Sequence, residues 1–401
     1  MAKRLTQVLG VDIGTQSTKI AALRAGKDGA SVTALGMTPT PEGTADHTGI
    51  FDPQTLGAML KSLIVEVHAG VRHLVLCISG QSAVVVRILE VPKMSDADLA
   101  QHMQWEIERN VPFAESDTVS DFRPVENPAL AATDNMEVVM AVSPRSAIET
   151  VLALIKAAGC KPAAIDVEPL GLGRVVQMCH GGDLAQKNVC VVHIGHSTTS
   201  INMYRQGVLA FPRTVPLGGS MLTQALADAF SLTVAEAEEK KRQEAAIPEA
   251  AAEAGFTAPG ATVQAEFEPY TPFGEESGEG AGEAATGEPK PAEEPAAPAA
   301  SDQVFQALQP QLEEFIAELR RSIDYYKSRG GEIEEIATSG GGANLKGLDA
   351  YMSRSMGLPV SRLNPFQGID VSVSGQAETY VSENASEFAV AMGMGLHIAY
   401  D

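Results

Sequence analysis

A cluster of small polar residues follows the first apolar run of the chain, in the stretch VDIGTQSTK at residues 11–19. Gly14 allows the chain to turn tightly there, because glycine adopts backbone conformations that other residues avoid. The backbone amides of Thr15, Gln16 and Ser17 then point into one concavity, which suits the oxygens of a phosphate. The pattern predicts a phosphate-binding hairpin, and a plain hairpin is the alternative interpretation.

Two charged side chains flank this turn. Lys19 supplies a point charge that attracts a phosphate. Asp12 offers the oxygen ligands that Mg²⁺ prefers, and an ion that keeps several of its waters would be held through them. The two residues together predict a phosphate site that also holds a hydrated magnesium ion.

A similar stretch, VVHIGHSTTS at residues 191–200, repeats the pattern around Gly195 but carries His193 where the first copy has an aspartate. The small polar residues of this second turn are Ser197, Thr198 and Thr199. A neutral imidazole does not anchor hydrated Mg²⁺ as a carboxylate does, because hard cations take oxygen ligands. A protonated His193 would contact a phosphate directly, and a histidine satisfied by a backbone partner is the alternative. His193 and His196 do not predict a transition-metal site, because no further ligands match them.

A run of glycines in SGGGANLKG, residues 339–347, is the third signal. Gly340, Gly341 and Gly342 follow a buried strand and precede a helix that we expect to begin near Asn344. Glycines let the backbone approach a flat or phosphorylated ligand closely, and the amides at a helix start favour anions. The position of the run favours ligand binding over a merely flexible turn.

The elements that must position these residues follow one plan twice. Residues 5–78 read as strand, hairpin, helix and strand, from the alternation and the helical spacing of apolar residues. Residues 82–162 read as a small unit of strand, helix, strand and helix, whose first helix starts at the Ser95 cap and stops before Pro112. From residue 188 the opening pattern restarts, with a hairpin turn at Gln206-Gly207. We therefore expect an α/β protein of two related domains that face one another.

The second half continues with a helix at SMLTQALADAF, a helical start at TVAEAEEKKRQEAA and a long helix at VFQALQPQLEEFIAELRRSIDYYKSRG. The chain then closes with the glycine-containing strand and helix, a strand-turn-strand around LPVSRLNP, and a last helix at SEFAVAMGMGLHIA. The predicted ranges are 1–81 for the core of the first lobe, 82–162 for an inserted α/β subdomain, 163–187 for a connecting helix region, 188–244 and 301–401 for the second lobe, and 245–300 for an insertion.

The charge of the chain is concentrated in that insertion. The net charge is −22, and residues 244–300 contain twelve Glu and one Lys, which is half of the total. A segment dominated by Ala, Pro, Glu and Gly buries too little apolar surface to fold, so we expect disorder, with an acidic binding tail as the alternative. The remainder has no basic stripe, and nucleic acid is therefore not an expected partner.

The remaining composition bears on the compartment. The four cysteines form no C-x-x-C pair, which favours buried reduced thiols over disulfides or a metal site. No apolar run approaches the roughly 18 residues that span a bilayer. We expect a soluble, cytoplasmic protein whose contact with a membrane is indirect, through a partner.

Taken together, the two phosphate hairpins, the Glu-x-x-Lys pair and the strand–GGGAxLxG–helix motif resemble the actin/Hsp70/sugar-kinase ATPase superfamily. Shorter stretches narrow the resemblance to the type IV pilus assembly protein PilM family, a relative of the cell-division protein FtsA; they are QWEIERNVPF, IDVEPLGLGR, PLGGSMLTQAL, AEAEEKKR, ELRRSIDYY, GGGANLKGL and PVSRLNPF. The resemblance covers residues 8–243 and 302–398. It implies the actin-like ATPase fold, with two duplicated lobes and an FtsA/PilM-type subdomain inserted in the first.

The same resemblance implies how a ligand would be held. ATP would lie between the lobes, with its phosphates at the two hairpins and its adenosine at the three glycines. Glu238 and Lys241 would contact the ribose and base. Glu168, in DVEPLGLGR, lies where relatives place the carboxylate that positions the hydrolytic water, and a helix N-terminal carboxylate is the alternative. Relatives carry a second aspartate where this chain has His193, so we expect nucleotide binding with weak or no hydrolysis, and a poor anchor for Mg²⁺.

A partner is implied in the same way. The PilM family is implied to bind the cytoplasmic N-terminal peptide of the membrane protein PilN, at the inner face of the cytoplasmic membrane, within a ring that supports pilus or secretion assembly. Trp105, Arg109 and Phe113 lie where the inserted subdomain would border the peptide groove, and core packing is the alternative. An FtsA-like membrane tether and an active kinase of the superfamily are the competing functions. The chain end MGLHIAYD has no basic amphipathic helix of the kind that a tether needs, and we recognise no sugar-site motif.

Overall fold

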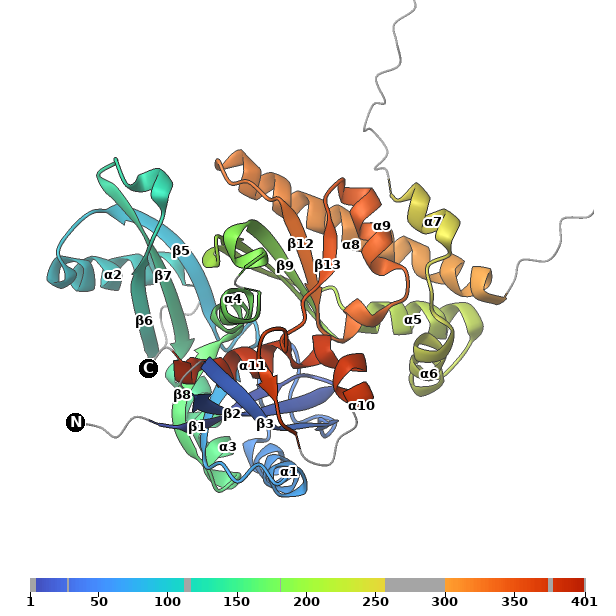
Figure 1. The fold of residues 1–401 in the computed structure, drawn as a ribbon, viewed down its shortest axis with the longest axis horizontal. Coiled ribbons are helices and arrows are strands. Elements are labelled where there is room, and N and C mark those ends of the chain that lie inside the picture. The colour runs from blue at the N-terminus through green and yellow to red at the C-terminus, as the bar shows by residue number, and fades with distance from the viewer. Residues whose placement is uncertain are drawn as a thin grey trace, which may run out of the picture.

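The computed structural model describes residues 5–26, 29–111, 117–180, 182–256, 300–373 and 378–399. Its first lobe is built on a six-stranded sheet with the order β14-β3-β2-β1-β4-β8 (Figure 1). The strands are β1 (Gln7–Ile13), β2 (Ser17–Gly26), β3 (Gly29–Pro39), β4 (His73–Ile78), β8 (Lys161–Val167) and β14 (Asp370–Val371). Helices α1 (Pro53–Glu66) and α3 (Arg145–Ala157) cover one face of this sheet.

The second lobe is built on a five-stranded sheet with the order β11-β10-β9-β12-β13. The strands are β9 (Asn188–Ile194), β10 (Thr199–Arg205), β11 (Val208–Val215), β12 (Glu335–Ser339) and β13 (Val360–Arg362). The helices on its outer side are α5 (Gly219–Phe230), α6 (Val234–Glu244), α7 (Glu249–Ala254), α8 (Ala300–Ser328) and α9 (Leu348–Met356). Their apolar side chains form one core with β9, β10 and β12.

The two sheets share one topology. In each, a run of three antiparallel strands ends with a central strand, β1 or β9, and two strands parallel to it follow. The first sheet has in addition the short strand β14, parallel to β3 at its outer edge. This shared strand order agrees with the repeat of the opening pattern that the sequence shows at residues 11–19 and 191–200. Because the turn after β1 and the turn after β9 occupy the same place in their sheets, each lobe presents its hairpin turn in the same way.

A layer of two helices fills the space between the sheets. It consists of α4 (Glu168–Cys179) and α11 (Ala389–Gly395), which pack on one another, and α11 also packs on β1 (Figure 1). Seven consecutive residues of α11 are buried, as expected for a helix enclosed on every side. The core around this layer includes strands of both lobes, so α4 and α11 join the lobes.

The inserted subdomain is a three-stranded sheet, β5-β7-β6, covered on one face by α2. Its elements are β5 (Val85–Pro92), α2 (Asp96–Asn110), β6 (Thr118–Val125) and β7 (Asn135–Pro144). The Ser95 hydroxyl accepts a hydrogen bond from the Asp98 amide, as predicted for a cap. An ion pair between Glu137 of β7 and Arg205 of β10, 3.2 Å long, ties the subdomain to the second lobe.

The structure divides the first lobe differently from the predicted range 82–162. Helix α3 packs on α1, and β8 joins the six-stranded sheet, so the inserted subdomain ends at Pro144. Sequence periodicity identifies α3 as amphipathic but does not say which core receives its apolar face. Strands β3 and β6 are also absent from the prediction, and around LPVSRLNP the structure has one short strand, β13.

Part of the predicted insertion 245–300 belongs to the second lobe. Residues 245–256 continue the second lobe through α7, and Ala245, Ile247 and Ala252 are buried in its core. Two of these three buried side chains are alanines. A composition rich in Ala and Glu does not reveal that such a segment packs on the core. Residues 257–299 lie outside the described residues. In the parts of the chain that the structure describes, no helix has the length and apolar character needed to cross a membrane.

The contact between β1 and α11 leads to a testable prediction. A Cβ atom added at Gly10 would lie 2.0 Å from the carbonyl oxygen of Ala391 and 2.3 Å from the amide nitrogen of Gly395. Backbone atoms on both sides prevent a local adjustment, so Gly10→Ala should lower the free energy of unfolding by about 3 kcal/mol or more. Chemical denaturation measures this. The exposed Gly182, whose Cβ would meet nothing within 4 Å, is the control, and equal stability of both variants would contradict the packing described.

Candidate functional site

A cleft of about 980 Å³ opens between the lobes, and both hairpin turns and the glycine loop line it. In the first turn the Gly14 amide donates to the Ser17 carbonyl over 3.1 Å, and the Thr40 hydroxyl donates to the Gly14 carbonyl over 2.7 Å. Asp12 and Lys19 face one another across the β1–β2 pair. All six residues predicted for this hairpin line the cleft: Asp12, Gly14, Thr15, Gln16, Ser17 and Lys19.

The second turn meets the first. The Gly195 amide donates to the Thr198 carbonyl over 2.9 Å, which repeats the geometry of the first turn. The hydroxyls of Thr15 and Ser197 form a hydrogen bond 3.1 Å long between the two lobes. The two hairpin turns therefore lie close enough for their side chains to form a direct hydrogen bond.

One residue predicted for the second turn lies elsewhere. Gly195, Ser197 and Thr198 line the cleft, but Thr199 is fully buried and its hydroxyl donates to the Leu217 carbonyl over 2.7 Å. Thr199 is the first residue of β10, so strand alternation turns its side chain away from the cleft and turns the next residue, Ser200, toward it.

Two carboxyl groups stand in the cleft in an environment that disfavours their charge. Burial raises the pKa of Glu168 to about 7, although a hydrogen bond donated by the Ser200 hydroxyl opposes this. Burial also raises the pKa of Asp12, against the lowering effect of the Lys19 charge. Glu168 is the first residue of α4 and its partner comes from the second hairpin, so it bridges the two lobes.

His193 occupies the second strand end as a neutral side chain. Burial lowers its pKa to about 4. Its Nδ1 atom lies 3.2 Å from the Ser339 hydroxyl, which itself donates to the Ser386 carbonyl over 3.1 Å. A side chain of β12 therefore satisfies His193, in place of the backbone partner considered in the sequence, and the protonated form that would attract a phosphate is disfavoured.

The glycine loop lies beside this histidine. Gly340 has φ +83°, and a Cβ there would lie 2.4 Å from the Ile194 carbonyl oxygen, so the position requires glycine. Gly340, Gly341 and Gly342 all line the cleft. The expected helix start near Asn344 is different in the structure: residues Gly341–Asn344 form one 3₁₀ turn, and α9 begins only at Leu348. The anion-favouring end of a full α-helix is thus absent from this loop.

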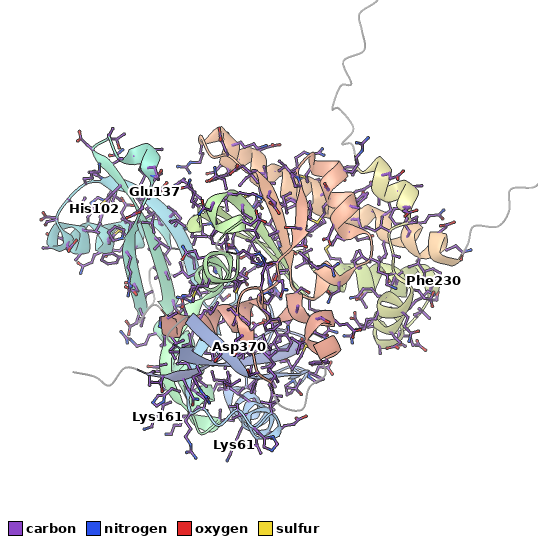
Figure 2. The ribbon with its side chains drawn as sticks, in the orientation of Figure 1. Lys61, His102, Glu137, Lys161, Phe230 and Asp370 are labelled. Carbon is purple, nitrogen blue, oxygen red and sulfur yellow. The ribbon has the colours of Figure 1, made fainter. Side chains whose placement is uncertain are left out.

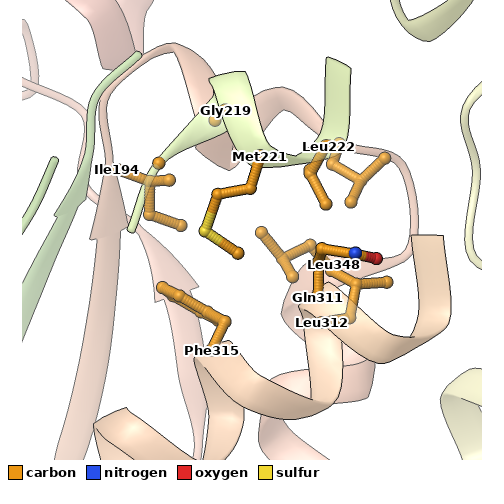
Figure 3. A pocket seen from close by; sticks show the side chains of 11 residues that line it. Ile194, Gly219, Met221, Leu222, Gln311, Leu312, Phe315 and Leu348 are labelled. Atoms are coloured by element: carbon orange, nitrogen blue, oxygen red, sulfur yellow. The ribbon is translucent and has the colours of Figure 1, made fainter. Parts of the chain in front are cut away.

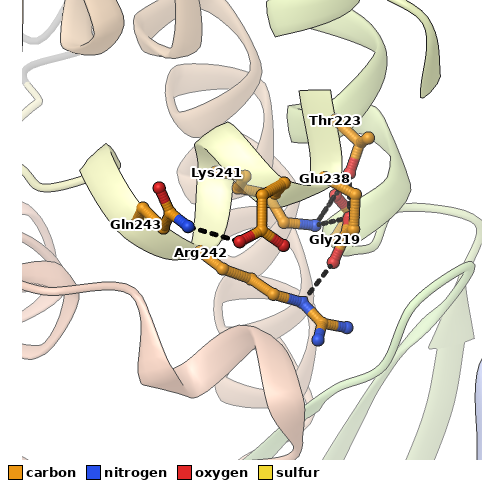
Figure 4. A network of polar contacts seen from close by, with 7 residues as sticks. Gly219, Thr223, Glu238, Lys241, Arg242 and Gln243 are labelled. Carbon is orange, nitrogen blue, oxygen red and sulfur yellow. Dashed lines mark hydrogen bonds and ion pairs between the residues drawn. The ribbon is translucent and has the colours of Figure 1, made fainter. Parts of the chain in front are cut away.

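Glu238 and Lys241 line the cleft as predicted, but they are occupied with one another (Figure 4). The Lys241 ammonium donates to Glu238 over 2.6 Å, to the Thr223 hydroxyl over 2.7 Å and to the Gly219 carbonyl over 3.0 Å. An ammonium has three protons, so these contacts use all of them. Lys241 therefore holds Glu238 in place. Burial acts to raise the pKa of Glu238, but hydrogen bonds donated by Lys241 and by the Thr223 hydroxyl outweigh it and lower this pKa to about 2.

Several residues that line the cleft are absent from the sequence-based prediction. Arg242 places its Nε atom 3.1 Å from Glu238, and the rest of its guanidinium is exposed. Among the others are His196, Lys346, Asn384 and Glu387. Arg242 follows Lys241 directly in EEKKR, which is a signal that charge patterning offers. Glu387 comes from a distant segment, and only the fold brings it here.

The residues predicted for a peptide groove lie apart from the cleft. Trp105 is 54% exposed on the outer side of α2, and the Arg109 guanidinium lies 4.6 Å from the centre of its ring. The same helix carries His102, which Figure 2 places at the opposite end of the molecule from Phe230 of α5. Phe113 lies outside the described residues. Because the Trp105 side chain is exposed and carries a cation on its face, the alternative of core packing does not hold for this residue.

Two lobes of one topology, facing hairpin turns and a glycine loop between them define the actin-like ATPase fold. The model of the family "type IV pilus assembly protein PilM" matches residues 10–254, and that of cell division protein FtsA matches residues 190–393. The chain belongs to the PilM family. Both the predicted fold class and the predicted family are thereby confirmed.

Individual proteins are similar to this chain in fold or in part of the sequence. A solved structure described as a PilM-PilN type IV pilus biogenesis complex covers 99% of both chains, with a TM-score of 0.76 and 24% identity. The ethanolamine utilization protein EutJ from Carboxydothermus hydrogenoformans covers 98% of this chain and 91% of its own, with a TM-score of 0.52 and 13% identity. The cell division protein FtsA of Neisseria meningitidis is 33% identical over 81 residues, which are 20% of this chain and 19% of that protein. The match therefore spans about a fifth of this curated relative.

The raised pKa of Glu168 leads to a prediction for stability. In the unfolded chain this carboxyl loses its proton near its ordinary pKa of 4.5, whereas in the folded protein it keeps the proton to about pH 7. Between these values the unfolded state binds fewer protons, so rising pH favours unfolding. Glutamine does not titrate, so Glu168→Gln avoids this loss. The unfolding free energy of the variant minus that of wild type should therefore rise by about 2–3 kcal/mol between pH 5 and pH 8. Urea denaturation across this range is the measurement, and a difference that stays constant with pH would contradict the assigned environment.

Proposed function

We propose that this protein is a cytoplasmic scaffold of a type IV pilus or related secretion assembly, which binds ATP between its lobes and hydrolyses it weakly or not at all. We further propose that it binds the cytoplasmic N-terminal peptide of a PilN-like membrane protein, and so stands at the inner face of the cytoplasmic membrane. The observation that carries the nucleotide claim is the convergence of two amide-rich turns and a glycine loop on one cleft of about 980 Å³.

The residues present fit a polar ligand of this kind. Among the described residues, the Nδ1 atom of His196 in the cleft is buried without a hydrogen-bond partner, which is costly unless a ligand supplies one. The amides of the two turns and the Lys19 ammonium suit the phosphates of ATP. The fit to Mg²⁺ is poorer, because Asp12 has a raised pKa and the second hairpin offers a neutral imidazole.

The role of each residue follows from these contacts. Mg²⁺, when bound, would screen the charge of the phosphates, and Asp12 would hold it through water. Glu168 would position a water, but one of its oxygens already accepts from the Ser200 hydroxyl, and at neutral pH the group is partly protonated, so only part of the protein has it free to accept the proton of a water. Glu238 would accept from a ribose hydroxyl. This arrangement supports retention of the nucleotide more than its turnover.

The nucleotide claim is tested with Lys19. Loss of its charge should weaken ATP binding about tenfold, in line with the roughly 1–2 kcal/mol of a charge-assisted contact. The measurement is the rise in unfolding temperature that ATP causes in wild type and in Lys19→Ala. The exposed Lys61 of α1, on the outer side of the first lobe, provides the matched control Lys61→Ala. Equal ATP-induced shifts in all three proteins would refute the assigned phosphate site.

The partner claim is supported by family membership and by the exposed Trp105. Large aromatic side chains in contact with a cation are typical centres of protein interfaces. As the single tryptophan of the chain, Trp105 also reports on its own environment. The proposed groove beside α2 would take an extended peptide across this ring. A ring of several copies and contacts with further assembly proteins belong to the same proposal.

The prediction uses a synthetic peptide of the first residues of the PilN-like protein from the same source. Binding should shift the Trp105 emission to shorter wavelength, because the peptide would cover an exposed ring. In calorimetry Trp105→Ala should weaken binding about tenfold or more, whereas Gln104→Ala, an exposed neighbour on α2, should not. Tight binding without a change in emission would place the peptide elsewhere on the molecule.

A further inference from the structure

A second, smaller cavity lies behind the end of the cleft at the glycine loop (Figure 3). The start of α5, the middle of α8 and the start of α9 enclose it. Apart from glycines, its lining is apolar with one exception, Gln311 of α8; the apolar residues are Ile194, Met221, Leu222, Leu312, Phe315, Leu345 and Leu348. Four residues line both this cavity and the cleft: Gly219, Leu222, Gly342 and Leu345. The cavity and the cleft therefore adjoin one another at these four residues.

Gln311 carries an unpaired acceptor. Its side-chain oxygen Oε1 is buried and has no hydrogen-bond partner among the residues that the structure describes. A buried acceptor without a donor is unfavourable, so a native structure that keeps one usually assigns it to a ligand or a water. The flanking residues Leu312 and Phe315 are buried in the core of the second lobe and fix this turn of α8. The helix thus holds the acceptor in an apolar wall.

The size of the cavity limits what enters it. Its volume of about 30 Å³ exceeds the roughly 10–15 Å³ that one water needs. A single amino group fits in this space, whereas a purine ring does not. A ring would have to remain in the cleft, against Gly342 and Leu345, and send only a substituent into the cavity.

We infer that Gln311 is a specificity-determining residue for the base of the bound nucleotide, whose exocyclic amine donates to the Gln311 oxygen. This inference rests on the proposed binding of ATP. The apolar walls suit the flat face of adenine, and the lone acceptor suits its 6-amino group, which is a donor. A base with a 6-oxo group presents an acceptor to the same oxygen and leaves both unpaired, so it binds more weakly.

The experiment compares three triphosphates that differ at one position. ATP carries a 6-amino group, purine riboside triphosphate carries hydrogen there, and inosine triphosphate carries an oxygen. Calorimetry on the full chain should find ATP bound about tenfold more tightly than purine riboside triphosphate, and inosine triphosphate bound more weakly still. In Gln311→Leu the difference between the first two should fall below about twofold. The control Gln306→Leu makes the same change at an exposed position of α8 and should keep the wild-type ranking.

The outcomes separate this inference from the proposed function. Failure of wild type to bind any of the three ligands would refute the proposed function itself. Equal binding of the three by wild type would overturn the role of Gln311 alone, and this holds even if the leucine variant does not fold. The unfolding temperature of ligand-free Gln311→Leu should equal or exceed that of wild type, because an unpaired acceptor is removed. A clear fall in that temperature, with the ranking of ligands unchanged, would make Gln311 a packing residue and also overturn the inference.

Discussion

The close contact of β1, α4 and α11 is the constraint on which the rest of the structure depends. Glycines allow it: a Cβ at Gly393 would lie 2.3 Å from the Gly171 carbonyl oxygen, and β1 meets α11 at Gly10. From this contact β1 runs into the first hairpin turn, α4 begins at Glu168, and the segment before α11 brings Glu387 to the cleft. The layer therefore sets both the separation of the lobes and the position of the groups between them.

Local patterns predicted the parts of the site that are themselves local. Each hairpin is a strand, a glycine and small polar residues, and the structure has both. Thr199 shows the limit of such a pattern, because strand alternation, which begins where the turn ends, buries its side chain. Lys241 shows another limit: its partners Gly219 and Thr223 come from α5, and no spacing within α6 indicates them. The prediction also misplaces the end of the inserted subdomain, because apolar periodicity does not identify the core that receives a helix. It assigns residues 245–256 to the insertion, because an Ala- and Glu-rich composition does not reveal their buried contacts.

The substitution of His193 gives the site its particular character. The strand end that faces Asp12 across the cleft carries a neutral side chain, which is tied to Ser339. Burial also leaves Asp12 and Glu168 less readily ionised than ordinary carboxyls. A triphosphate in this cleft would meet the turn amides and Lys19 beside two carboxyls that ionise less readily than usual, which favours its binding without strong assistance from a metal. The proposed scaffold would then use ATP as a ligand that holds the two lobes together.

The measurement that tests this account most directly is a calorimetric titration of ATP into the purified protein, with Mg²⁺ and then with the metal removed by a chelator. The account predicts binding in both conditions, with dissociation constants within about threefold of one another, because Asp12 and His193 offer Mg²⁺ only a poor anchor. A threefold ratio corresponds to less than about 0.7 kcal/mol, since each tenfold change in affinity requires about 1.4 kcal/mol. Tight binding that appears only with Mg²⁺ would contradict the role given to His193. Absence of binding in both conditions would contradict the nucleotide site as a whole.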